Sequence, residues 1–96
     1  MILKIQSSVA ETVDDTTPIT IPLKAFPWVA RILATIPIFV AVGPEGVTAD
    51  DESFYVNEFD DVYLAIGAGE EISILGSDAG DEDAVAYVAH VTPSGP

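Results

Sequence analysis

The chain contains no cysteine, one histidine and only three basic side chains, Lys4, Lys24 and Arg31, in 96 residues. Without cysteine there are no disulfides and no thiolate metal sites, so apolar burial or contact with other subunits must supply the stability. Nucleic-acid binding without sequence preference needs clustered Lys or Arg against the phosphates. Three separated cations do not provide this, and we expect no nucleic-acid partner.

A single histidine also argues against hydrolytic chemistry. A triad needs a nucleophile, a base and an orienting acid, and His90 lies alone within an apolar run that is typical of a strand. We expect His90 to be a packing or surface residue. Carboxylate pairs could occur anywhere among so many acids, so they do not indicate glycoside chemistry. The sequence therefore predicts a protein that is not an enzyme, and the alternative of a small enzyme has the least support.

Acidic residues, in contrast, are abundant. There are sixteen Asp and Glu, the net charge is −13, and 49% of the residues are nonetheless hydrophobic. A disordered acidic tail would not need so many apolar residues, so the acids are expected to coat a folded body. Two interpretations of the charge stay open: adaptation to a high-salt organism, or ordinary solubility charge with an acidic face for a basic partner. The shortage of Lys combined with many Ala, Val and Thr favours the first.

The length predicts a single domain over residues 1–96. Residues 1–5 lack a basic region followed by a sustained apolar run, so no signal peptide is expected. Residues 25–42 are apolar enough to suggest a membrane span, but they contain two prolines and a central Arg31. Proline breaks a helix, and an arginine at the bilayer centre is costly. We therefore expect no membrane partner.

Short runs of β-branched and aromatic residues recur about every ten residues between Gly, Pro and acidic residues. This spacing predicts an all-β domain, a small β-sandwich or jelly-roll-like barrel of seven to eight short antiparallel strands. Residues 27–35 are the best helical alternative, because proline is tolerated at a helix start. The expected strands are 1–6, 19–21, 29–34, 38–42, 54–56, 62–66, 72–75 and 85–91. The expected irregular segments are the loops 9–18 and 76–83, the turn 67–71 and the tail 92–96.

Two acidic segments, 50–52 and 78–83, offer the hard oxygen ligands that calcium prefers. Neither has the twelve-residue spacing of an EF-hand, with glycine at position six and glutamate at position twelve. Residues 67–71, which contain two glycines, end in two glutamates, the wrong charge for a phosphate. We expect solvated acidic loops and neither a metal nor a cofactor.

Three residues form the candidate partner interface: Phe26, Trp28 and Arg31. Phe26 and Trp28 flank a proline and form either an exposed aromatic anchor or a buried corner of the sandwich. Alternation along the strand places Arg31 on the face opposite to Trp28. As the only arginine of an acidic chain, Arg31 pairs with a carboxylate either inside the domain or across a subunit boundary.

Residues 30–91 carry a pattern of strands and turns with a familiar order. It runs through residues 31–35, 37–43, 47–49, 66–75 and 86–88. In this it resembles the small β-sandwich virion proteins of tailed bacteriophages and archaeal viruses, which serve as capsid decoration proteins, head-fibre bases and minor tail components. The pattern includes no catalytic or binding motif, so no functional residue is carried over. The acid excess departs from typical phage examples and suits a virus of a salt-loving host.

The resemblance implies a non-enzymatic structural protein of a tailed virus. We expect a capsid decoration or minor capsid protein that is located in the virion and binds the major capsid protein, other virion proteins or sibling subunits as a homo-oligomer. The alternative is a tail, baseplate or fibre-associated binding module that depends on carbohydrate or calcium. Its aromatic platform would be drawn from Trp28, Tyr55, Tyr63 and Tyr87.

Overall fold

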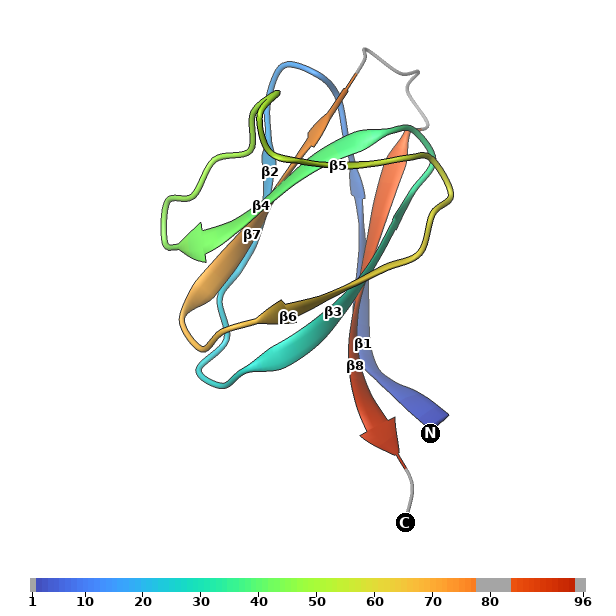
Figure 1. The fold of residues 1–96 in the computed structure, drawn as a ribbon, viewed down its shortest axis with the longest axis vertical. Coiled ribbons are helices and arrows are strands. Elements are labelled where there is room, and N and C mark those ends of the chain that lie inside the picture. The colour runs from blue at the N-terminus through green and yellow to red at the C-terminus, as the bar shows by residue number, and fades with distance from the viewer. Residues whose placement is uncertain (1, 78–83, 95–96) are drawn as a thin grey trace.

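The protein is a sandwich of two open, four-stranded antiparallel sheets (Figure 1). The computed structural model describes residues 2–77 and 84–94, with side chains for 8–77 and 84–91. This confirms the predicted all-β fold of seven to eight short strands, with the two sheets remaining separate instead of closing into a barrel. The strands are β1 (Ile2–Thr12), β2 (Ile19–Ile21), β3 (Trp28–Ala34), β4 (Ile38–Pro44), β5 (Phe54–Val56), β6 (Val62–Ile66), β7 (Glu70–Gly76) and β8 (Val85–Ser94).

The topology follows from one long hairpin that folds over on itself. β1 pairs with β8, β2 with β7, β3 with β6 and β4 with β5, so the connection between β4 and β5 is the tip of the hairpin. Rolling the hairpin adds the pairs β3–β8 and β4–β7. The first sheet then has the order β1-β8-β3-β6 and the second β2-β7-β4-β5. Two sheets in this order form the jelly-roll type of sandwich.

The core lies between the sheets and is made of β-branched and small residues. Burial alternates strictly along β3, where Trp28, Ala30, Ile32 and Ala34 face inward. Alternate side chains of a strand point to opposite faces, so the residues between them face outward. The other sheet contributes β-branched residues to the same cluster, namely Ile21, Ile38, Val40, Val56, Ile72 and Ile74.

Three predicted strand boundaries are wrong. The expected loop 9–18 begins too early, because Val9 to Thr12 continue β1 and pair with β8. Glu70 and Glu71 belong to β7, where they face Pro44 and Gly43, and β8 continues through the expected tail to Ser94. In each case a partner strand supplies backbone hydrogen bonds that override the polar character of the segment. β1 and β8 run side by side past the ends of β3 and β6 (Figure 1).

The alternatives to strands in residues 25–42 are also resolved. Both the helix considered for 27–35 and the membrane span considered for 25–42 are replaced by β3 and β4. No helix within the described part of the chain has the length and apolarity to cross a membrane. The turn between β6 and β7 is present as predicted. Gly69 there has φ +79°, a left-handed conformation that favours glycine.

Candidate interaction surface

The outer face of the first sheet presents a surface with two exposed tyrosines, and we call it the tyrosine face. Tyr87 on β8 lies opposite Leu33 on β3, and Arg31 on β3 lies opposite Tyr63 on β6. Tyr63 is 50% exposed and Tyr87 is 48% exposed. The outward positions of the described strands that define this face are Ser8, Ala10, Thr12, Val29, Arg31, Leu33, Tyr63, Ala65, Val85, Tyr87 and Ala89.

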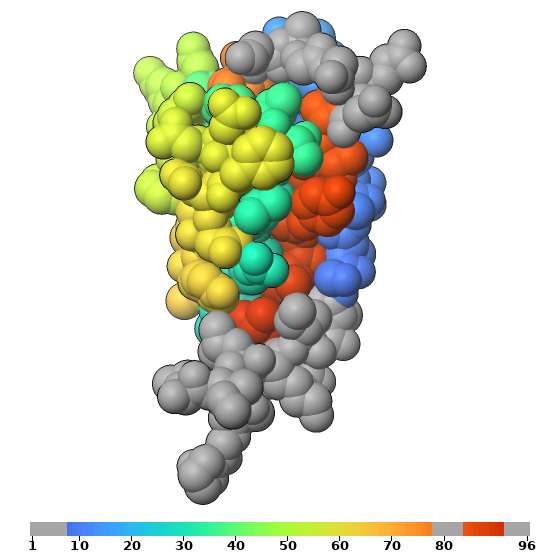
Figure 2. Space-filling view, turned by 90° about the vertical axis from the view of Figure 1, so that its right-hand side faces the viewer, coloured from blue at the N-terminus to red at the C-terminus, as the bar shows by residue number. Residues whose placement is uncertain are grey.

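None of these positions holds Asp or Glu, although the chain has sixteen acids. The face is also hollowed. A depression of about 240 Å³ lies beside Arg31, Leu33 and Tyr87, and Ser8, Val88 and Ala89 complete its lining. Figure 2 shows this side of the molecule, with β6 in yellow, β3 in teal, β8 in red and β1 in blue next to one another. In a protein that otherwise coats itself with carboxylates, this acid-free apolar face is the candidate interaction surface.

Arg31 is the only charged side chain on the tyrosine face, and it forms an ion pair with Asp61 at the rim of this face. Its Nη2 lies 2.7 Å from Asp61 Oδ1, and its Nε donates to the same oxygen at 3.0 Å. Both side chains are partly exposed, so the pair contributes at most about 1 kcal/mol to folding. Its main effect is to fix the direction of the guanidinium, on a strand that lies between the strands of the two tyrosines.

The structure separates the three residues of the candidate partner interface. Arg31 points outward on the tyrosine face, whereas Trp28 on the same strand points inward and is only 6% exposed. Phe26, in the linker before β3, is 51% exposed. Trp28 thus occupies a buried corner, Phe26 remains available at the surface, and Arg31 pairs inside the domain. The three do not share one surface.

Trp28 instead lines a second feature, a slot between the free edges of β1 and β2, and Phe26 lies next to His90 of its wall. The slot has a volume of about 180 Å³. Its walls are Ser8, Val9, Glu11, Thr20, Ile21, Pro22, Leu23, Lys24, Trp28, Val88 and His90. Lys24 Nζ lies 5.1 Å from the centroid of the indole of Trp28, a cation–π contact. The carbonyl of Lys24 accepts the N–H of Gly69, which holds the linker in place.

His90 packs among aromatic rings at this slot. Its ring centroid is 5.3 Å from that of Trp28, edge to face, and 5.8 Å from that of Phe26. The packing role expected for His90 agrees with this position. The indole Nε1 of Trp28 is buried and has no hydrogen-bond acceptor among the described residues.

The acidic segment 50–52 forms a local turn. Asp50 Oδ1 accepts the N–H of Glu52 at 2.9 Å, and the Ser53 hydroxyl accepts the N–H of Asp50 at 3.0 Å. The other calcium candidate, 78–83, lies outside the described residues. Within the described ranges no group of three or more acidic or histidine side chains converges on a point where a metal ion would sit.

Asp14 shows what one of the loop carboxylates does. Its Oδ1 accepts the backbone N–H groups of Thr17 and Thr16, each at 2.9 Å, and the Thr16 hydroxyl at 3.0 Å. These bonds, the one from the Thr17 backbone first, hold the pKa of Asp14 below its ordinary value of 3.8. The carboxylate therefore closes the loop between β1 and β2 in its ionised form.

The lowered pKa gives a pH-dependent prediction. A depressed carboxyl pKa contributes stability above its unfolded value, and that contribution disappears as the pH falls through the folded value. Asp14→Ala should therefore be less stable than the parent at neutral pH, and the gap should close as the pH falls below 3.8. Urea unfolding at several pH values measures it, with Asp15→Ala as the matched control. A gap that is constant with pH would contradict the assignment.

No family model, curated protein or solved structure matches the chain. Function is therefore argued from the fold and its surfaces. Sequence reasoning missed the tyrosine face, although its signal was present: the outward positions of β3, β6 and β8 alternate with core residues and carry no acid. Finding it required knowing that these strands are neighbours in one sheet.

Proposed function

We propose that the protein is a non-enzymatic structural component of a tailed-virus particle, a capsid decoration or minor capsid protein that docks through the tyrosine face. The acid-free, apolar outer surface of the first sheet carries this proposal. Interfaces are typically rich in Tyr and Arg and poor in acidic residues at their centre, with a polar rim. Tyr63, Arg31 and Tyr87 at the centre and Asp61 at the rim match that composition.

The fold adds a second, weaker support. Jelly-roll sandwiches of eight strands recur in viral capsid and lectin domains, and this likeness in fold is an analogy, not evidence about a site. A rigid sheet is a suitable base for a docking surface because its side chains are fixed by the register of the strands. The acidic loops at the ends of the sheets would remain in solvent and keep decorated particles apart.

Binding to particles tests the proposal. Tyr87→Asp places a carboxylate at the centre of the tyrosine face. The binding partner in the test is a particle of the encoding virus that lacks this protein. We expect the substitution to raise the Kd for these particles by at least about 30-fold, the size of effect that loss of an interface hot spot has. Sedimentation with the particles measures it. Tyr87→Phe should bind like the parent, because the ring and the fold remain. A parent protein that ignores the particles, or an Asp variant that binds equally well, would refute the docking surface.

The binding-module alternative uses the same tyrosines differently. If the chain belongs to a tail or fibre, Tyr63 and Tyr87 would stack on sugar rings, and a glycan array would give signals that Tyr87→Ala removes while Tyr87→Phe retains them. Particle binding without glycan binding favours the decoration role. Glycan binding without particle binding favours the alternative.

A further inference from the structure

Exposed apolar side chains gather at two opposite edges of the sandwich. Val9 and Leu23 lie at the slot between β1 and β2, and the ring of Phe26 packs at a tilt beside His90 of its wall. Phe54 and Phe59 lie on β5 and on the loop from β5 to β6. The strand order places β1 and β2 at one end of the two sheets and β6 and β5 at the other. Phe59 is bonded to Ala34 at the end of β3, whereas the slot is lined by Trp28 at the start of the same strand. One molecule thus carries a hollow apolar edge and, away from it, a projecting aromatic ring.

The slot has the size of an aromatic ring. Its volume is about 180 Å³, and an apolar cavity of roughly 150 Å³ in a protein accepts benzene. Val9 and Leu23, at 44% and 42% exposed, leave part of its apolar lining open to solvent. A phenyl side chain entering there would cover both and would approach Trp28 and His90.

Phe59 is the projecting group that fits. It is 64% exposed, the highest value among the large hydrophobic residues that the structure describes. Its backbone has φ +59°, which is strained for a bulky residue. Its N–H donates to the carbonyl of Ala34 at 2.8 Å. That bond anchors the backbone at the point where the ring projects, so the ring is presented at little further cost in entropy.

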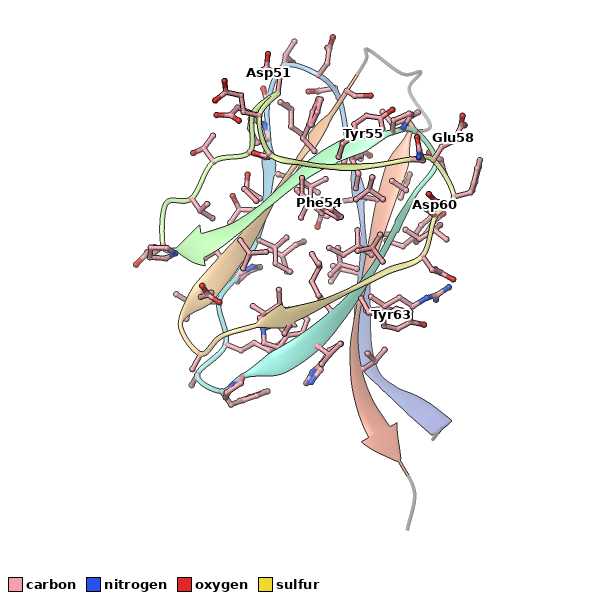
Figure 3. All side chains as sticks on the ribbon, in the orientation of Figure 1. Asp51, Phe54, Tyr55, Glu58, Asp60 and Tyr63 are labelled. Carbon is pink, nitrogen blue, oxygen red and sulfur yellow. The ribbon has the colours of Figure 1, made fainter. Side chains whose placement is uncertain are left out.

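The charges of the two edges are complementary where they would meet. Phe59 lies between Glu58 and Asp60 in the sequence, and Figure 3 shows both acids on the loop beyond β5, near Tyr55. Lys24 lines the slot and makes no ion pair with a carboxylate of the described residues. An incoming acidic loop would therefore place a carboxylate beside the ammonium of Lys24, which lies over the ring of Trp28. Glu11, the single carboxylate of the slot wall, opposes this attraction. Each copy also carries a net charge of −13, so the overall repulsion between copies is what salt relieves.

We propose that copies of the chain assemble head to tail, with Phe59 of one copy inserted into the slot of the next. Because the inserting and receiving edges differ, the contact is heterologous, and successive copies close a ring if the rotation allows it and otherwise extend as a filament. Tyr87 takes no part in the contact, so this assembly does not depend on particle docking.

Light scattering on a sizing column tests the assembly at about 1 M NaCl, where repulsion is screened. The parent should elute as a multiple of 10.1 kDa. Phe59→Ala, which lacks the inserting ring, and Val9→Phe, which fills the slot, should each be monomeric, whereas Tyr87→Ala should assemble like the parent. Trp28 is the only tryptophan, and its emission should shift with dilution in the parent but not in Phe59→Ala.

Mixing the two variants separates loss of contact from loss of fold. Phe59→Ala retains an open slot, and Val9→Phe retains the inserting ring of Phe59. In an equimolar mixture the ring of a Val9→Phe molecule can enter the slot of a Phe59→Ala molecule, and the resulting pair has neither a free slot nor a free ring to extend it. We expect a species of twice 10.1 kDa that does not grow. A monomeric parent, a Phe59→Ala variant with the parent's mass, or a mixture that stays monomeric would each overturn the proposal.

Discussion

Replacing Ile74 by alanine is expected to destabilise the protein by about 2–5 kcal/mol, since this is the measured cost of truncating a fully buried isoleucine or leucine. Ile74 is 0% exposed and lies on β7 between Ile19 of β2 and Val40 of β4. Three neighbouring strands therefore surround its side chain. None of them can shift to fill the cavity that alanine leaves without breaking its register with the next strand. A domain of this size has a free energy of unfolding of about 5–15 kcal/mol, so one substitution removes a large share of it.

Leu75→Ala is the matched control. Leu75 is the next residue on β7 and points to the other face of the sheet, where it is half-buried. Urea unfolding of both variants should show a small loss for Leu75→Ala, within about 1 kcal/mol, and several times that for Ile74→Ala. Equal losses would mean that the inner and outer faces of β7 have been assigned wrongly.

The strands could be predicted from the sequence because their information is local. Alternation along β3 and the short runs at β2, β5 and β6 are visible without any partner strand. The ends of β1, β7 and β8 could not be predicted, since they depend on pairing with distant segments. Thr12, for example, is extended because it faces Val85 across the sheet. Polarity along a single segment does not contain that information.

The surfaces were harder to predict than the strands, for the same reason. The sequence correctly predicts that Arg31 and Trp28 point to opposite faces of the sheet, because alternate residues of one strand point to opposite faces. The alignment of Arg31 with Tyr63, and of Leu33 with Tyr87, needs the register of β3 against two other strands. The slot needs more still. Its walls come from β1, β2, the linker before β3, β3 itself and β8, and only the packing of the two sheets brings them together.

The location of the acids gives the charge excess a structural meaning. The acids of the described loops are Asp14 and Asp15 between β1 and β2, Glu45 and residues 50–52 between β4 and β5, and Glu58, Asp60 and Asp61 between β5 and β6. The tyrosine face carries none. Repulsion between molecules is therefore strongest around the loops and weakest across the tyrosine face. If the protein docks through the tyrosine face as proposed, this arrangement lets that face approach a partner while the acidic loops stay in solvent.

The second large effect is expected from salt. With a net charge of −13 and one ion pair among the described residues, repulsion between carboxylates opposes folding. The screening length falls from about 10 Å at 0.1 M salt to about 3 Å at 1 M. We expect Tm to rise by at least about 5 °C between roughly 0.05 M and 1 M NaCl, the shift that about 1 kcal/mol produces in a domain of this size.

A variant with three fewer carboxylates shows whether charge is the cause. Glu45→Gln, Asp51→Asn and Glu52→Gln together change exposed residues of the loop between β4 and β5. Their removal should raise Tm in dilute buffer and flatten the dependence on salt, and the two proteins should converge near 1 M NaCl, where the charges are already screened. Calorimetry measures both curves. If the variant and the parent respond to salt by the same amount, the stabilisation comes from the general effect of salt on apolar burial, and adaptation to a saline environment loses its physical basis.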